Sequence, residues 1–306
     1  MPARAHVTLD DLMRLRGRAR GFSLLPHQPP GGALAGRHTS RLRGRGLDFM
    51  EMRHYQDGDD VRAIDWRATA RLREPYVRVY TEERDRIVLL LVDQRISMFF
   101  GSKRATKSVA AAEAAALGAW RVVRAGDRVA AIAFDDRELI VVRPARGAAA
   151  AQRVLSEVAR LNAGLNAATA LADDAMLNRA LGEAARLAAH DWLVVLISDA
   201  VGADETTRGL VGTIAAHNDI IAVFVFDPLE TALPPIGSVV LAAGPARLQV
   251  DTRSGSLRRG HAEAFAARRE AIAAFGRHRA IPVIEVCTDT DPGLQIRAAL
   301  AGRRAG

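Results

Sequence analysis

The sequence predicts an α/β protein built on a doubly wound, mostly parallel sheet. From residue 87 onward, short apolar segments alternate with longer segments of helical periodicity. Several of the short segments are continuous apolar runs, which are typical of strands whose two faces are both covered by helices. The resulting order of elements, β-α-β-β-α-α-β-α-β, is that of a doubly wound fold.

The expected strands cover about residues 87–92, 128–134, 138–142, 193–198, 220–226 and 282–286. The expected helices cover about residues 105–124, 148–160, 173–189, 204–217, 261–279 and 292–301. Between Asp227 and Arg259, a Gly-Pro pair separates the segments GSVVLAA and ARLQVD, which predicts a β-hairpin insertion.

The residues before the sheet form a mixed N-terminal extension. A short helix is expected from Thr8, with Asp11 at the capping-box position, to about Arg20. Residues 26–36 have the composition of a linker, and residues 47–80 combine extended segments with a polar turn and a helical piece. We therefore divide the chain into residues 1–35 (helix and linker), 36–86 (mostly extended) and 87–306 (sheet domain, with the insertion at about 228–260).

The composition narrows the class of protein. The single cysteine, Cys287, excludes an internal disulfide and a cysteine metal cluster, and its apolar surroundings predict a buried, inert thiol. No apolar run is long enough to cross a bilayer, and the N-terminus has no segment of signal-peptide type. We therefore expect a cytoplasmic protein.

The charge is positive and is concentrated near the N-terminus. The chain has 43 basic and 35 acidic residues, a net charge of +8, and all basic residues except Lys103 and Lys107 are arginines. The first 45 residues contain an arginine-rich arm, made of Arg14, Arg16, Arg18, Arg20, Arg37, Arg41, Arg43 and Arg45. Such an arm suits nucleic acid, an anionic membrane surface or an acidic partner, and the alternative is a solvated face.

Three of the expected strands end in an aspartate: Asp93, Asp199 and Asp227. Ligands of open parallel sheets bind at the carboxyl ends of the strands, where the chain order reverses. Asp227 is followed by Pro228, so we expect it to cap a helix. Asp93 and Asp199 predict a shared site, which needs a cation, a proton or an arginine to offset two carboxylates.

The usual catalytic signatures are absent from the sequence. It has no phosphate-binding G-x-x-x-x-G-K-[ST] loop, no G-x-S-x-G elbow and no H-E-x-x-H motif. The segment QDGDDVRAID lacks ligands that a calcium loop requires, and no histidines are paired at ligand spacing. A metal-dependent hydrolase that uses Asp93 and Asp199 remains an alternative, although it lacks a convincing general base.

The strand-terminal residues resemble those of the von Willebrand factor A-like domain. That resemblance implies a metal-ion-dependent adhesion site, built from D-x-S-x-S after the first strand, a threonine and a later aspartate. Asp93, Ser97, Thr169 and Asp199 take these positions. In the family such residues hold an oxygen-loving cation such as Mg²⁺ and leave one position for a partner's carboxylate. The resemblance also implies a Rossmann-type doubly wound sheet.

A longer signature resembles the bacterial "domain of unknown function 58" family, over about residues 36–300. Its pattern, R-x-Y-x-x-G-D-D-x-R-x-I-D-W followed by A-R, is matched by Arg53, Tyr55, Gly58, Asp59, Asp60, Arg62, Asp65, Trp66 and Arg71. The resemblance implies no catalytic activity. It implies an adaptor that works with a MoxR-type AAA+ ATPase in chaperone-like maturation or remodelling of client proteins.

Arg95 departs from the adhesion-site pattern, because it stands where the first serine is expected. A guanidinium can bind Asp93 and Asp199 through forked hydrogen bonds, so we expect a site that is metal-free or binds Mg²⁺ weakly. The alternative is that Arg95 turns into solvent and that Asp93, Ser97 and Thr169 still hold Mg²⁺.

The sequence leaves alternatives for the role of the signature segment and for the function of the protein. The charged residues of the signature, with Trp66 as an apolar anchor, suit either an ion-pair network that fixes this segment or a surface for a partner. The function we favour is a noncatalytic protein-interaction adaptor with a degenerate adhesion site. A nucleic-acid-binding protein that uses the arginine-rich arm is the alternative, although no aromatic stacking series or nucleic-acid module is present.

Overall fold

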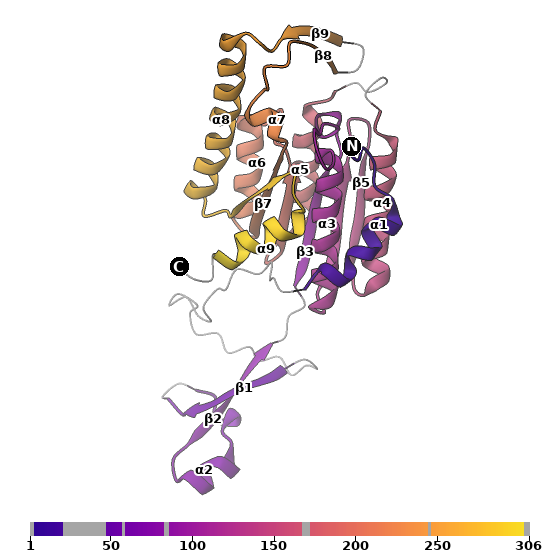
Figure 1. The fold of residues 1–306 in the computed structure, drawn as a ribbon. Helices are drawn as coiled ribbons and strands as arrows, with labels where there is room; N and C mark the ends of the chain where they lie inside the picture. Colours follow the sequence, from indigo (N-terminus) through magenta and orange to yellow (C-terminus); the bar gives the residue numbers. More distant parts are fainter. Residues whose placement is uncertain are drawn as a thin grey trace. The chain divides into compact units, whose positions relative to one another are not determined.

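The computed structural model describes residues 3–20, 47–56, 59–82, 86–166, 172–243 and 246–302. The chain forms two compact units (Figure 1). One, the sheet unit, contains Met1–Pro26 and Arg86–Gly306, and the other, the small unit, contains His27–Asp85.

The sheet unit is built on six strands. They are β3 (Ile87–Asp93), β4 (Arg128–Phe134), β5 (Leu139–Ala145), β6 (Leu193–Ser198), β7 (Asp219–Phe226) and β10 (Val283–Cys287). Their order is β10-β7-β6-β3-β4-β5, and all neighbours are parallel except β5, which runs antiparallel to β4. The prediction of a mixed α/β fold with a mostly parallel sheet is confirmed. The chain passes from β3 to β4 on one side and later to β6 on the other, so the order reverses between β3 and β6.

Helices cover both faces of this sheet (Figure 1). They are α3 (Lys107–Arg124), α4 (Ala148–Gly164), α5 (Ala175–Leu187), α6 (Glu205–Ala215), α8 (Gly255–His278) and α9 (Pro292–Gly302). Successive β3 residues alternate between the faces, as in any strand. Leu90 packs with α3 and α4, whereas Leu89 and Leu91 pack with α5 and α6. Because both faces are covered, β3 reads as a continuous apolar run.

A short N-terminal helix, α1 (Leu9–Arg14), packs on the sheet unit. The predicted capping box is present, since Thr8 and Asp11 bond reciprocally to each other's backbone N–H. The α-helix ends at Arg14 and continues as a 3-10 turn, η1 (Leu15–Arg18), earlier than the predicted end. The indole N–H of Trp120 on α3 donates to the carbonyl of Leu12, 3.2 Å away. From the sequence we grouped this helix with the linker. In the structure it packs on the sheet unit and belongs to that unit.

The predicted hairpin insertion is confirmed. Strands β8 (Ser238–Ala243) and β9 (Ala246–Asp251) pair antiparallel, and a one-turn helix, α7 (Pro228–Thr231), precedes them. Helix α8 begins at Gly255, six residues before its predicted start at about residue 261, because Ser254 caps it by accepting from the N–H of Leu257. The polar composition of this first turn concealed the helix in the sequence.

The described residues of the small unit form one hairpin and two short helical segments. Strand β1 (Leu47–His54) pairs antiparallel with β2 (Tyr76–Glu82), and the predicted helical piece between them forms η2 (Val61–Ala63) and α2 (Trp66–Leu72). Across the described residues of both units, no helix combines the length and apolar character needed to span a membrane.

Candidate functional site

The candidate site lies at the carboxyl ends of β3 and β6, where the strand order reverses. These strands are direct parallel neighbours, so the structure brings Asp93 and Asp199 together. Both aspartates are fully buried. Arg95 and Ser97 lie on the segment that follows β3, and their side chains contact these two aspartates. Thr169 lies outside the described residues.

Arg95 binds Asp93 through a forked pair of hydrogen bonds. Its Nε is 3.1 Å from Oδ1 of Asp93 and its Nη2 is 2.8 Å from Oδ2. The same carboxylate accepts from the backbone N–H of Arg95 at 3.0 Å and from the hydroxyl of Ser198 at 2.7 Å. The side chain of Arg95 is 2% exposed, so the alternative in which it turns into solvent does not describe this structure. Burial lowers the pKa of Arg95, but the charge and hydrogen bonds of Asp93, together with the charges of Asp199 and Asp136, outweigh burial, so that the pKa is raised.

Asp199 is neutralised by a residue that sequence analysis did not select, Lys107. The ammonium of Lys107, at the start of α3, lies 2.8 Å from Oδ2 of Asp199. The other carboxylate oxygen accepts from the hydroxyl of Ser97 at 3.3 Å and from the N–H of Val201 at 3.0 Å. Burial alone would raise the pKa of Asp199, but the charge and hydrogen bond of Lys107 lower it below the ordinary value. Asp199 and Lys107 are therefore both charged at neutral pH.

The charged residues continue beyond Asp199. Lys107 also donates to Glu230, 3.1 Å away, and Glu230 accepts from Nη2 of Arg268 at 3.0 Å. Nη2 of Arg95 lies 3.9 Å from Oδ1 of Asp199 and links the two halves. Six side chains of alternating sign thus form a continuous series, which we name the charge chain: Asp93, Arg95, Asp199, Lys107, Glu230 and Arg268.

One sequence signal for Lys107 was present. It is one of only two lysines in the chain, and it begins a helix whose next residues are almost all alanine or valine. Such a helix is buried, and a buried ammonium requires a compensating anion. Glu230 and Arg268 gave no comparable signal, because their contacts depend on how α7 and α8 pack.

The arrangement does not fit a divalent cation as it stands. A metal of the Mg²⁺ type needs free carboxylate oxygens. All four carboxylate oxygens of Asp93 and Asp199 instead accept hydrogen bonds from the chain's own groups, which include a guanidinium and an ammonium. A metal would have to displace both cations. Within the described ranges, no group of three or more His, Cys, Asp or Glu side chains is placed to hold an ion.

Asp136 lies near the site on the loop after β4. Its carboxylate accepts from the N–H groups of Ile96 and Asp173, at 2.5 and 2.9 Å. It thereby joins the segment after β3 to the segment before α5. Burial raises the pKa of Asp136 despite these bonds and the charge of Arg95. Asp136 was not predicted as a site residue, because it is not the last residue of an apolar strand but the second residue after β4.

Residues 51–271 match the family described as "Protein of unknown function DUF58". The chain belongs to this family. An "Uncharacterized protein Rv1480" of Mycobacterium tuberculosis is 31% identical over 310 residues, which cover 100% of this chain and 94% of the relative. An "Uncharacterized protein MAV169" of Mycobacterium avium is 36% identical over 121 residues, 37% of this chain and 71% of the relative.

Two solved structures from Bacteroides species were also found for this DUF58 chain. The "conserved hypothetical protein BatB" of Bacteroides thetaiotaomicron has a TM-score of 0.43 and 12% identity, and covers 72% of this chain and 100% of its own. An "aerotolerance-related membrane protein" of Bacteroides fragilis has a TM-score of 0.43 and 13% identity, over 71% and 98% of the two chains.

The third strand-terminal aspartate of the DUF58 chain has the predicted capping role. Asp227 accepts from the N–H of Leu229 at 2.9 Å and forms a capping box with Glu230 at the start of α7. This box also positions Glu230, since one of its oxygens binds the N–H of Asp227 while the other binds Lys107.

The family-signature residues fix the fold of the small unit. Arg53 forms a forked ion pair with Asp59, at 2.7 and 2.8 Å. Asp60 caps η2 and Asp65 caps α2. The backbone N–H of Tyr55 donates to the carbonyl of Pro75 at 2.8 Å. The remaining polar signature residues are Arg62 in η2, Arg71 in the last turn of α2, and Gly58, which lies outside the described residues.

Trp66, which the sequence suggested as an apolar anchor, lies at the start of α2 with its side chain 68% exposed. The described residues of the small unit form a hairpin and two short helical segments, which leave this side chain uncovered. The aromatic side chain therefore lies on the surface, where it can contact another molecule.

Part of the arginine-rich arm is engaged in the sheet unit. The guanidinium of Arg16 lies 5.4 Å from the ring centre of Trp120, and Arg18 pairs with Asp291. The residues from Arg37 to Arg45 lie outside the described ranges. Cys287 is partly buried, and burial raises the pKa of its thiol to about 11, as expected for an inert thiol.

Proposed function

We propose that this DUF58 protein is a noncatalytic adaptor that binds other proteins. In this proposal the sheet unit is a von Willebrand factor A-like, Rossmann-type domain, and its adhesion site is degenerate. The reversal of strand order between β3 and β6 supports the assignment, as do the positions of Asp93, Ser97 and Asp199 beside it. Arg95 and Lys107 take the charge-balancing role that a metal ion has in an intact adhesion site.

The state of the two aspartates supports an adaptor over a metal-dependent hydrolase. A general base must reach the proton that it abstracts. Asp93 and Asp199 are fully buried, and their carboxylate oxygens are occupied by hydrogen bonds from groups that include Arg95 and Lys107. We therefore infer that Asp93 and Asp199 stabilise the fold and do not take part in catalysis.

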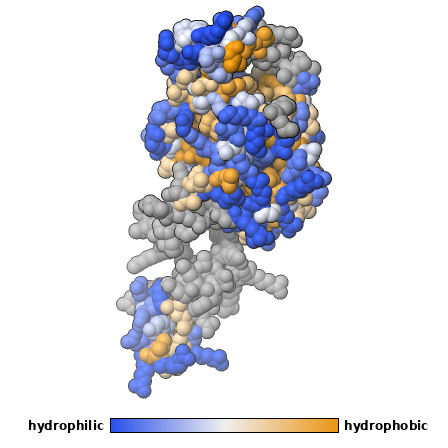
Figure 2. All heavy atoms as spheres, in the orientation of Figure 1, coloured by the Kyte–Doolittle hydropathy of each residue, from blue (hydrophilic) through white to orange (hydrophobic). Residues whose placement is uncertain are grey.

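The observation that carries the proposal is the apolar surface of the small unit. Four large hydrophobic side chains of this unit are exposed: Met52 by 41%, Val61 by 58%, Trp66 by 68% and Leu72 by 47%. Figure 2 shows hydrophobic residues on the visible face of the unit. Aromatic residues and methionine are enriched in protein interfaces, and tryptophan is frequent among residues that dominate binding energy. We name these four residues the apolar patch.

We propose a MoxR-type AAA+ ATPase of the same organism as the partner that the apolar patch contacts. The chain would act in the cytoplasm and present a client protein to the ATPase for maturation or remodelling. This assignment follows from the family resemblance, and the exposed patch supplies a surface for it. The engagement of Arg16 and Arg18 in the fold favours this proposal over a nucleic-acid-binding arm.

The experiment is a binding titration of the purified full chain with the purified ATPase, in the presence of nucleotide. We expect saturable binding that Trp66→Ala weakens at least tenfold, about 1.4 kcal/mol. The matched control is Val240→Ala in the hairpin insertion, another exposed apolar residue (60%), which should leave the affinity unchanged. Absence of binding, or equal effects of the two substitutions, would contradict the proposal.

A further inference from the structure

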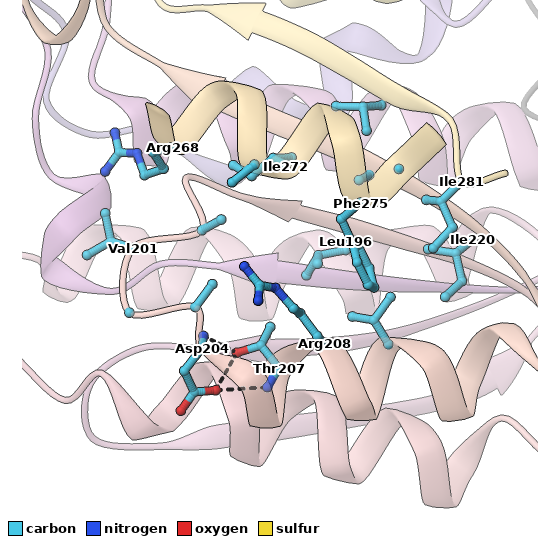
Figure 3. Close-up of a pocket in the computed structure, with 18 residues that line it drawn as sticks. Leu196, Val201, Asp204, Thr207, Arg208, Ile220, Arg268, Ile272, Phe275 and Ile281 are labelled. Carbon is cyan, nitrogen blue, oxygen red and sulfur yellow. Dashed lines mark hydrogen bonds between the residues drawn. The ribbon is translucent and has the colours of Figure 1, made fainter. Parts of the chain in front are cut away.

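A pocket beside helix α8 has no part in the proposed adaptor function. It lies between α6, α8 and strands β6, β7 and β10, and its volume is about 300 Å³. This is at the lower end of the range of small-molecule pockets, roughly 300–1,000 Å³. Its walls are mostly apolar, with Leu196, Val211, Ile220, Ile272, Phe275 and Ile281 among them. Figure 3 shows Leu196, Ile220, Ile272, Phe275 and Ile281 among the side chains that line the pocket.

The two ends of the pocket differ in character. In Figure 3, Arg268 and Val201 lie at one end, whereas Ile220 and Ile281 lie at the other. The strand pairing agrees with this view, since Ile220 is at the start of β7 and Val201 follows the end of β6. The four residue steps from Val194, the partner of Ile220, to Ser198 correspond to about 13 Å of strand. The pocket is thus elongated along the strands, with a cationic end and an apolar end.

Arg268 has hydrogen-bonding capacity left at the cationic end. Its Nη2 is bound to Glu230, but its buried Nε has no hydrogen-bond acceptor among the residues that the structure describes. A buried donor without an acceptor costs free energy, which a ligand oxygen would recover. Arg208 adds a second guanidinium, and Figure 3 shows it extending from α6 toward α8. Its Nη1 already donates to Glu205 at 2.8 Å, so Arg208 contributes positive charge rather than a free donor.

Carboxylates near this end are already engaged. Asp204 also lines the pocket, but it accepts from the N–H of Thr207 at 2.8 Å and from the amide of Asn178 at 3.0 Å, as the cap of α6. Glu230 is shared between Arg268 and Lys107. The donor without an acceptor is therefore Nε of Arg268, and arginine forms strong charge-assisted bonds with carboxylates.

We propose that this pocket binds a small amphipathic carboxylate, with its alkyl chain along β6 and β7 and its headgroup at Arg268. The proposal does not depend on the adaptor role. The ligand would also touch the loop after β6. In that loop the carbonyl of Val201 accepts from Arg95 at 3.0 Å and its N–H donates to Asp199. A bound ligand would thereby contact a loop residue that is itself hydrogen-bonded to Arg95 and Asp199 of the candidate site.

The experiment is a calorimetric titration of decanoate into the full chain, with decanol as the uncharged comparison. We expect decanoate to bind at least tenfold more tightly than decanol. Arg268→Gln should weaken decanoate binding at least tenfold. The matched control is Arg269→Gln, the neighbouring residue, which pairs with Glu285 and does not line the pocket. If Arg268→Gln does not fold by circular dichroism, Arg208→Gln takes its place with the same expected direction.

The location of binding is read from backbone amide resonances. The Val201 amide should shift on addition of decanoate, and the amide of Val141 on the edge strand β5 should not. Ala222→Leu, which adds volume inside the pocket, should abolish binding. The proposal is overturned if decanol binds as tightly as decanoate, if Arg269→Gln acts like Arg268→Gln, if Ala222→Leu still binds, or if nothing binds.

Discussion

The ammonium of Lys107 lies 2.8 Å from the carboxylate of Asp199, and both side chains are almost completely buried. The two residues are 92 positions apart in the chain and come from α3 and the end of β6. Burial disfavours each charge, yet the pKa of Lys107 is raised and that of Asp199 is lowered, because each supplies the other's counter-charge. The pair is the centre of the charge chain.

Loss of Lys107 should strongly destabilise the fold. In Lys107→Met, Asp199 loses its ammonium donor, and Glu230 loses one of its two cations and keeps Arg268. Removal of one partner from a buried ion pair costs about 3–5 kcal/mol. We expect the free energy of unfolding, measured with urea, to fall by about this amount.

The matched control is the other lysine of the chain. Lys103 is 64% exposed and lies 3.8 Å from Asp289, so Lys103→Met should change the free energy of unfolding by less than about 0.5 kcal/mol. A cost for Lys107→Met as small as that for Lys103→Met would show that the charge chain does not stabilise the fold.

The substitution at position 95 should decide whether the site accepts a metal. We expect no saturable binding of Mn²⁺ to the chelator-treated wild-type protein. Arg95→Ser supplies the hydroxyl that the adhesion-site pattern expects and frees Asp93 of the guanidinium, while Lys107 stays on Asp199. It should therefore bind Mn²⁺ with no better than about millimolar affinity, as weak oxygen-ligand sites do. Arg95→Lys keeps a cation beside Asp93 and should not bind. Submillimolar affinity in the wild type would contradict this account of Arg95.

The central part of the fold could be predicted from the sequence because burial on both faces leaves a simple pattern. Strand β3 was expected over residues 87–92 and spans Ile87–Asp93, and β6 matches its expected range of 193–198. The convergence of Asp93 and Asp199 followed from the parallel arrangement alone. Arg95 could be predicted to bind a carboxylate because it stands where the adhesion-site pattern expects a serine, two residues after Asp93.

The rest of the site depends on packing that leaves no local pattern. Arg268 reaches Glu230 only because α8 crosses beside α7, and the polar first turn of α8 concealed even the start of that helix. Trp66 is a second example. Its hydrophobicity suggested an apolar anchor, but its side chain is 68% exposed, because the packing that would cover a side chain cannot be read from one residue.

Two carboxylates at the site, those of Asp199 and Asp136, should give opposite pH dependences. The pKa of Asp199 lies below its ordinary value of 3.8, so its charged form adds stability above pH 3.8. This contribution is lost as the pH falls through the lowered pKa. The stability difference between wild type and Asp199→Asn should therefore be constant near neutral pH and shrink in acid below 3.8.

Asp136 supplies the comparison. Its pKa is raised by burial, so the stability of its protonated form is present below pH 3.8 and is lost as the pH rises through the raised pKa. Relative to Asp136→Asn, the wild type should therefore gain stability on acidification. Urea unfolding of both variants over a series of pH values measures the two slopes, and slopes of the same sign would contradict these protonation states.

Two glycines of α8 should respond in opposite directions to the same substitution. At Gly276 an added Cβ would lie 2.6 Å from a side-chain methyl of Val283 and 3.0 Å from the carbonyl oxygen of Ile281. Gly276→Ala should therefore separate α8 from β10 and cost about 1–3 kcal/mol. At Gly260 no heavy atom beyond the adjacent backbone of α8 itself lies within 4 Å of the added Cβ, so Gly260→Ala should stabilise the helix by up to about 1 kcal/mol. Thermal unfolding of both variants measures the difference, and destabilisation by Gly260→Ala equal to that by Gly276→Ala would contradict the close packing of α8 on β10.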